Sequence, residues 1–100
     1  MKKIEVVFLP VHKPPYVGTI KNSLRSFQKY VGGYIETFPI FGDVLAIVDE
    51  EGKLKGYPQN WEYSGERLVG TLFFTAHDGK GEFRSLTDEE TEKVIQLVND

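Results

Sequence analysis

The stretch DVLAIVDE, residues 43–50, indicates how this chain folds. Residues 44–48 form an unbroken apolar run, which is typical of a central strand covered on both faces. Upstream, GYIETFPIF at residues 33–41 predicts a second strand, joined to the first by a Phe-Gly-Asp turn. Downstream, DEEGK at residues 49–53 predicts a hairpin turn with Gly52 at the position that needs a positive φ. Residues 53–55 then predict a short returning strand, which Pro58 ends.

Towards the N-terminus the sequence predicts a strand, a loop and a helix. Residues 4–9 are rich in β-branched and aromatic side chains, and paired prolines make residues 11–18 a loop. A helical stripe follows, because apolar residues recur at steps of three and four. Its members are Val17, Ile20, Leu24, Phe27 and Val31. Gly32 and Gly33 come next and predict the left-handed end of this helix.

Basic residues recur at every fourth position along the same predicted helix. They are Lys21, Arg25 and Lys29. A solvated helix face explains such a stripe, and a surface that faces an anion or a partner protein is the alternative.

The C-terminal third predicts two strands and a second helix. Residues 67–75 supply the apolar side chains of a strand, and Asp78-Gly79 predicts a turn after which residues 82–85 return as a short strand. Thr87 and Glu90 match the capping box that starts a helix. That helix is expected to turn Val94, Ile95 and Val98 inward.

These elements predict an α+β fold, a single small domain over residues 1–100 with a mostly antiparallel sheet and two helices packed on it. The expected order is β-α-β-β-(β)-β-β-α, in which the bracketed strand is the short one at residues 53–55. Both helices are expected on one side of the sheet.

Composition excludes several classes of protein. A hydrophobic content of 40% and a charged content of 27% are ordinary for a soluble globular domain. The net charge of -3 argues against a dedicated duplex nucleic-acid binder. With no cysteine, the chain forms neither disulfides nor thiolate zinc sites, and no segment has the length of a membrane span. We expect a cytoplasmic protein.

Residues that often carry catalysis do not form a recognisable set. His12 and His77 lie in separate predicted loops. The acidic residues at 49–51 follow one another on a strand end, where side chains alternate sides, and lack the spacing of a calcium loop. GKLKG at residues 52–56 lacks the order of a phosphate-binding loop. The sequence therefore predicts no enzyme, no metal site and no cofactor.

The segment EEGKLKGYPQNWEY, residues 50–63, is the candidate binding surface. Its rings stand among Gly56, Pro58 and Gly65, which is typical of a chain running over the surface. Rings beside amines and amides suit either the binding of a nucleobase-phosphate ligand or a hot spot of a protein–protein interface. The candidate contacts are Lys53, Lys55, Tyr57, Asn60, Trp61 and Tyr63. The alternative is that the rings close the edge of the core as lids.

The sequence also resembles the family known as domain of unknown function 3846. The resemblance rests on VGGYIE at 31–36, EEGKLKGYPQN at 50–60, GTLFF at 70–74 and GEFRSLTDEE at 81–90. Members often have Asn at the position of Asp49 and a basic residue at that of Trp61, so the resemblance does not extend a ligand contact to Trp61. It implies an accessory protein of a phage or mobile element in the cytoplasm of Gram-positive bacteria.

Three functions follow as hypotheses. The first is a non-enzymatic binding protein that acts on a host defence or regulatory component through residues 52–63, helped by the basic stripe. The second is an oligomeric sponge for a nucleotide messenger, with phosphates bound by Lys53, Lys55 or Arg67. The third is a single-stranded nucleic-acid module, which the acidic net charge disfavours.

Overall fold

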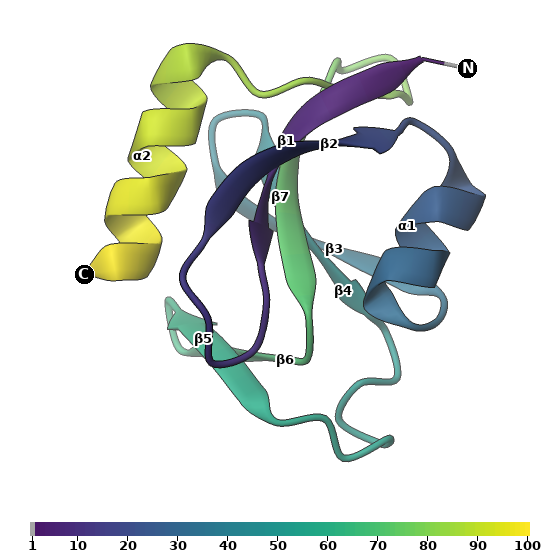
Figure 1. Ribbon diagram of the computed structural model, residues 1–100, viewed down its shortest axis with the longest axis vertical. Helices are drawn as coiled ribbons and strands as arrows, with labels where there is room; N and C mark the ends of the chain where they lie inside the picture. The colour runs from purple at the N-terminus through teal and green to yellow at the C-terminus, as the bar shows by residue number, and fades with distance from the viewer. Residues whose placement is uncertain (1) are drawn as a thin grey trace.

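A computed structural model describes residues 2–100 and shows an antiparallel sheet with helices on it (Figure 1). The elements are β1 (Lys3–Leu9), β2 (Tyr16–Lys21), α1 (Leu24–Val31), β3 (Ile35–Phe41), β4 (Val44–Asp49), β5 (Gln59–Tyr63), β6 (Glu66–Val69), β7 (Leu72–His77), β8 (Phe83–Arg84) and α2 (Asp88–Asn99). The main sheet has the order β2-β1-β7-β4-β3, with β8 beside β7, and β5 and β6 form a separate hairpin. Every strand pair is antiparallel, which confirms the predicted α+β class.

Strands β7 and β4, and the second half of β1, are buried on both faces, as the run at residues 44–48 predicted for its own strand. Val44 and Ala46 join one buried cluster, which α2 and the β5–β6 hairpin cover, and Ile47 joins the other, which α1 covers. The two helices therefore lie on opposite faces, and the expectation that both lie on one side is wrong. Strands that are apolar on both faces need a cover on each, since each helix hides only one face.

Strand β2 replaces the first turns of the predicted helix. Val17 and Ile20 lie on this strand, where they pair residue by residue with β1, and the helix begins only at Leu24. Ser23 explains that start, because its side chain accepts a hydrogen bond from the Ser26 amide at 3.2 Å, as an N-cap does. The apolar residues at steps of three and four thus belong to two elements, a strand and the helix that follows it.

Residues 50–63 form turns and then a strand, where a short strand and a loop were expected. The prediction of a strand at residues 53–55 is wrong, because these residues lie in turns. Gly52 does not have a positive φ. A side chain there is excluded by crowding instead, since a Cβ would lie 2.9 Å from a methyl group of Val69.

The predicted strand at residues 67–75 is divided into β6 and β7. Gly70, with a φ of 78°, separates the two strands. The C-terminal helix is confirmed with its capping box, in which Thr87 and Glu90 satisfy each other's backbone amides. Val94 is buried, and Ile95 and Val98 pack against the same cluster.

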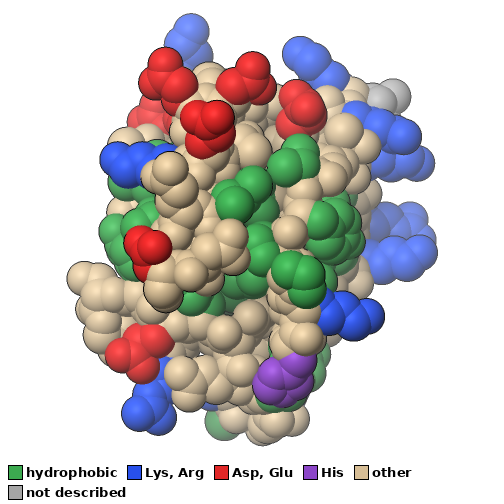
Figure 2. Space-filling view, turned by 60° about the vertical axis from the view of Figure 1, so that its left-hand side comes forward, with side chains coloured by type: hydrophobic (Ala, Val, Ile, Leu, Met, Phe, Trp, Pro, Cys, Tyr) green, Lys and Arg blue, Asp and Glu red, His purple; other side chains and the backbone are tan. Residues whose placement is uncertain are grey.

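The side of the sheet under α2 keeps part of its hydrophobic surface open. Figure 2 turns that side forward and shows hydrophobic side chains gathered in its middle, with acidic side chains above them and basic ones around the rim. No helix within residues 2–100 is long and apolar enough to cross a membrane.

Candidate functional site

The carboxylate of Asp49, at the end of β4, is the buried charge around which residues 50–57 fold. Its side chain is only 1% exposed, and it accepts hydrogen bonds from Lys55 Nζ at 2.7 Å and from the Glu51 amide at 2.9 Å. Burial raises the pKa of this carboxyl, but the bonds from Lys55 and Glu51, together with the nearby Tyr57 hydroxyl, outweigh it and hold the pKa below its usual range. Lys55 also donates to the Gly32 carbonyl at 3.0 Å, so its ammonium group is committed to the fold.

Glycines give Tyr57 and Lys55 the room that this arrangement needs. A Cβ on Gly33 would lie 2.6 Å from Lys55 Nζ, and a Cβ on Gly32 would lie 2.6 Å from the Tyr57 hydroxyl. On the other side of the ring, a Cβ on Gly70 would lie 2.5 Å from Tyr57 Cδ2. Three of the quoted segments that carry the family resemblance, at residues 31–36, 50–60 and 70–74, therefore meet at one structural cluster.

Asn60, Trp61 and Tyr63 also build the fold. Asn60 Nδ2 donates to the carbonyls of Leu9 and Gly70, each at 2.8 Å, and so ties the hairpin to the main sheet. The Trp61 ring stacks on Tyr63 at 5.1 Å between ring centroids and meets Phe74 edge-on at 5.4 Å. Both rings are half-buried against the cluster under α2. The two rings thus cover part of the core while remaining partly exposed, and their role in binding stays a prediction.

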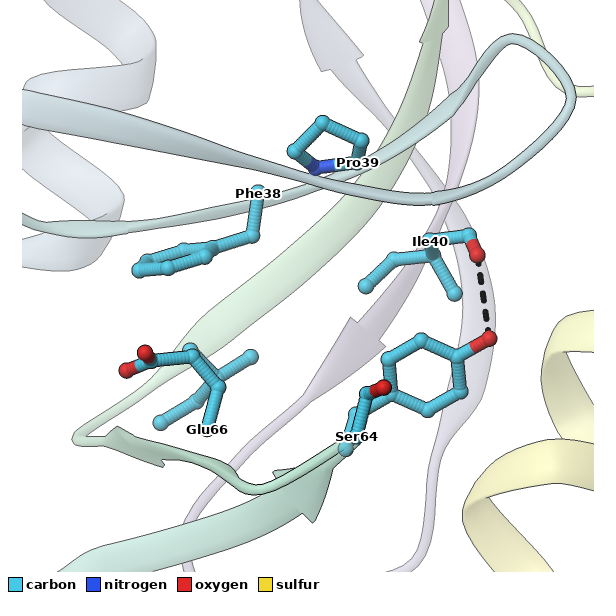
Figure 3. Close-up of a pocket in the computed structure, with 7 residues that line it drawn as sticks. Phe38, Pro39, Ile40, Ser64 and Glu66 are labelled. Carbon is cyan, nitrogen blue, oxygen red and sulfur yellow. Dashed lines mark hydrogen bonds between the residues drawn. The ribbon is translucent and has the colours of Figure 1, made fainter.

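A groove opens beside the hairpin, between β3 and β6. One part encloses about 330 Å³, with Phe38, Pro39 and Ile40 on the β3 wall and Ser64 and Glu66 on the hairpin wall (Figure 3). Tyr63 closes one end, where its hydroxyl donates to the Ile40 carbonyl at 3.0 Å. A second part of about 290 Å³ shares Phe38, Glu66 and Leu68 with the first, so we treat the two as one feature, the β3–β6 groove.

Negatively charged side chains predominate in the lining of the second part of the groove. Glu36, Glu50 and Glu66 line it, with Lys53 and Arg67 as its cations. Lys53 lies 3.7 Å from Glu66, and Arg67 Nε lies 3.7 Å from Glu62. Glu36 and Glu50 form no ion pair within residues 2–100. The groove therefore combines apolar walls with carboxylates that have no partner in the part of the chain that the structure describes.

Other predicted contacts lie apart from this groove. Lys21 lies on β2, whereas Arg25 and Lys29 lie on α1, so the three do not form one helical stripe. A shallower recess of about 300 Å³ opens beside Trp61 and Asn60, with Lys13, Pro15 and Val98 among its other lining residues. Of the predicted contacts, Lys53, Tyr63 and Arg67 line the β3–β6 groove, and Lys55, Tyr57, Asn60 and Trp61 do not.

The sequence did not point to Phe38, Ile40, Glu66 or Leu68. One signal was available, because a proline inside a strand run, here Pro39, marks an edge strand. Within residues 2–100 no group of His, Asp and Glu is arranged to hold a metal ion. His77 Nε2 lies 3.6 Å from Asp43, and its Nδ1 accepts a bond from the Gly79 amide in the turn.

Comparison with known proteins identifies the family of this chain by its sequence model. The sequence model of the family described as Domain of unknown function (DUF3846) matches residues 1–99. Neither the curated proteins nor the solved structures give a significant match.

Proposed function

This chain belongs to the DUF3846 family, and we propose that it is a non-enzymatic binding protein that holds a segment of a partner protein in the β3–β6 groove. The observation that carries the proposal is the pairing of an apolar cleft with unpaired carboxylates at one place. The family resemblance supports a narrower version, in which the chain is an accessory protein of a phage or mobile element and its partner is a defence or regulatory component of the host cytoplasm.

The chemistry of the groove specifies the segment that it binds. Phe38 is half-exposed and offers an apolar contact, whereas Ile40 and Leu68 are themselves buried, and a large apolar side chain gains about 25 cal/mol for each Å² it removes from water. Glu36 and Glu50 lie at the second part of the groove and attract a Lys or Arg side chain. The preferred segment therefore carries a large apolar residue close to a basic one.

A nucleotide ligand is less well supported by the same groove. Phosphate binding requires free cations, but Lys55 is bound to Asp49, and Lys53 and Arg67 each lie 3.7 Å from a carboxylate. Carboxylates also outnumber cations along the lining. The charge of the groove thus favours a basic peptide over an anion, and the separation of Lys21 from α1 weakens the nucleic-acid alternative.

Selection from a random peptide library on the wild-type chain tests the proposal. We expect enriched peptides with a large apolar residue within a few positions of Lys or Arg. The double variant Glu36→Lys/Glu50→Lys should weaken their binding at least about tenfold, since two exposed carboxylates are reversed. Arg25→Glu, on the far face, is the matched control and should bind as the wild type does.

Two outcomes would contradict this function. The first is a library that yields no enriched sequence, and the second is peptides whose affinity is the same in the groove variant. A thermal-shift panel of nucleotides tests the alternative, because a ligand at a hundredfold excess over Kd raises stability by about 2.7 kcal/mol. A nucleotide that gives such a shift would replace the peptide hypothesis.

A further inference from the structure

The two edges of the main sheet differ in how well they are protected against further strand pairing. β3 forms one edge, where Pro39 and a register shift between Pro39 and Phe41 interrupt the strand. Both features are typical of edges that natural proteins keep from pairing. β2 forms the other edge, and its six residues pair with β1 without a bulge or a proline.

The hydrogen bonds at the end of β2 show which backbone groups point outward. The Asn22 amide donates to the Lys2 carbonyl at 2.8 Å, so Asn22 faces β1. In an antiparallel pair, the backbone N–H and C=O groups of successive residues point alternately towards the partner strand and away from it. The N–H and C=O groups of Val17 and Thr19 therefore point away from β1. The Lys21 amide also points outward, while the Lys21 carbonyl accepts a bond from the Ser23 amide at 2.8 Å.

Hydrophobic side chains accompany this open edge. Among the large hydrophobic side chains that residues 2–100 leave exposed, Tyr16 at 50% and Val17 at 49% lie on β2, and Leu24 at 57% follows it closely. Val17 is opposite Val7, which belongs to the cluster under α2, so Val17 lies on the same face of the sheet as α2. Tyr16 lies on the other face, where its ring meets Phe8 at 5.0 Å between centroids.

We propose that two copies of this chain associate as a closed dimer by antiparallel pairing of their β2 strands around Gly18. In that register Val17 is opposite Thr19 of the second copy, and the two residues exchange both main-chain hydrogen bonds. Tyr16 is opposite Ile20 of the second copy, an aromatic and β-branched pair that stabilises a sheet. The Lys21 amide reaches the Pro15 carbonyl of the second copy.

The strand fits itself better than it fits an arbitrary peptide. Lys21 is its one charged residue, and the register places it opposite Pro15, so no like charges face each other. A twofold axis uses the same edge of both copies and leaves no β2 edge open. Because β3 is interrupted, the assembly ends at two copies. This proposal does not depend on the peptide groove, which lies beside β3 at the opposite edge.

Sedimentation velocity over a range of concentrations tests the dimer. The wild-type chain should sediment at twice its monomer mass of 11.4 kDa at high concentration and dissociate on dilution. Val17→Glu and Thr19→Lys should each raise the dissociation constant at least about tenfold, because each puts like charges within reach across the twofold axis. The double variant Val17→Glu/Thr19→Lys should recover the dimer, since the carboxylate introduced in one copy then faces the ammonium group introduced in the other.

Thr37→Lys is the matched control, because it changes an exposed threonine on the β3 edge and should leave the dimer unchanged. Circular dichroism confirms that each variant is folded. A wild-type chain that stays monomeric up to several hundred micromolar would overturn the proposal. So would a dimer that both single variants leave intact, or one that the double variant fails to restore.

Discussion

The aromatic segment at residues 57–63 and the β3–β6 groove beside it use their side chains in opposite ways. Within the aromatic segment, Asn60 and Tyr63 donate their hydrogen bonds to backbone carbonyls of the chain itself, and Trp61 packs on Phe74. In the groove, apolar side chains line open space, and Glu36 and Glu50 have no ion-pair partner within the described residues. Side chains of the aromatic segment thus take part in holding the fold together, whereas the groove carboxylates Glu36 and Glu50 do not.

This contrast predicts that variants of the two regions differ in which property they change, stability or binding. Substitutions in the aromatic segment and at Gly70, which lies against its Tyr57 ring, should lower the free energy of unfolding. Substitutions of exposed groove residues should change binding at nearly constant stability. The predictions below run from the largest expected effect to the smallest.

Gly70→Ala should cost the most stability, about 3–4 kcal/mol, because it adds the strain of a positive φ to a collision with Tyr57. Gly70 has a φ of 78°, and a Cβ there would lie 2.5 Å from the ring. Gly42→Ala is the matched control, since Gly42 also has a positive φ but open space around it, and about 1 kcal/mol is expected. Urea unfolding measures both. Equal losses at the two glycines would show that the Tyr57 ring is free to move.

Trp61→Ala should cost about 2–3 kcal/mol, because it empties a half-buried site against Phe74. Trp61→Phe keeps a ring at this site and should lose less than half as much. Thermal and urea unfolding of the two variants make the comparison. A Trp61→Ala protein as stable as the wild type would make the ring a candidate binding residue again.

Asp49→Asn should cost about 1 kcal/mol at neutral pH, because the amide still accepts from the Glu51 backbone while the ion pair with Lys55 is lost. Since the pKa of Asp49 is lower folded than unfolded, the wild type is stabilised by this carboxylate above its ordinary pKa. That stabilisation is lost as pH falls through the lowered pKa. The free energy of unfolding of the Asn variant should therefore fall less steeply below about pH 4. If the free energy of unfolding of the two proteins fell equally steeply with decreasing pH, the lowered pKa of Asp49 would be contradicted.

Glu36→Lys, Glu50→Lys and Glu66→Lys should each change stability by less than about 0.5 kcal/mol, because these side chains are exposed and the one ion pair among them is long. These substitutions should instead lower the affinity for a basic peptide. Urea unfolding checks the first part and peptide titration the second. A large loss of stability in any of them would mean that the groove carboxylates hold the fold together.

The sequence predicted most of the architecture from local signals. The apolar run at residues 44–48, the capping box at Thr87 and Glu90, and the short strand at residues 82–85 are all confirmed, because each depends on neighbouring residues. The β2 strand was missed although Ser23 marked the true helix start. Apolar steps of three and four across Val17 and Ile20 imitate a helix when a strand runs into one.

The candidate site was less predictable, because it depends on contacts between distant segments. Asn60 lies 51 residues from Leu9 in the chain, yet its amide bonds to the Leu9 carbonyl. The groove likewise forms only when β6 comes to lie beside β3. No local pattern carries such information, whereas the rings of residues 57–63 are conspicuous in the sequence and predict a binding surface by themselves.

An amide-resolved NMR titration of the wild-type chain with a selected apolar-basic peptide tests the central claim most directly. Shifts should concentrate at Phe38, Ile40, Glu66 and Leu68, with smaller ones at Glu36 and Glu50, and α1 should remain unchanged. The assignment of binding to the groove would be contradicted if the shifts were confined to Trp61, Tyr57 and the surrounding turn while the resonances of β3 and β6 did not move.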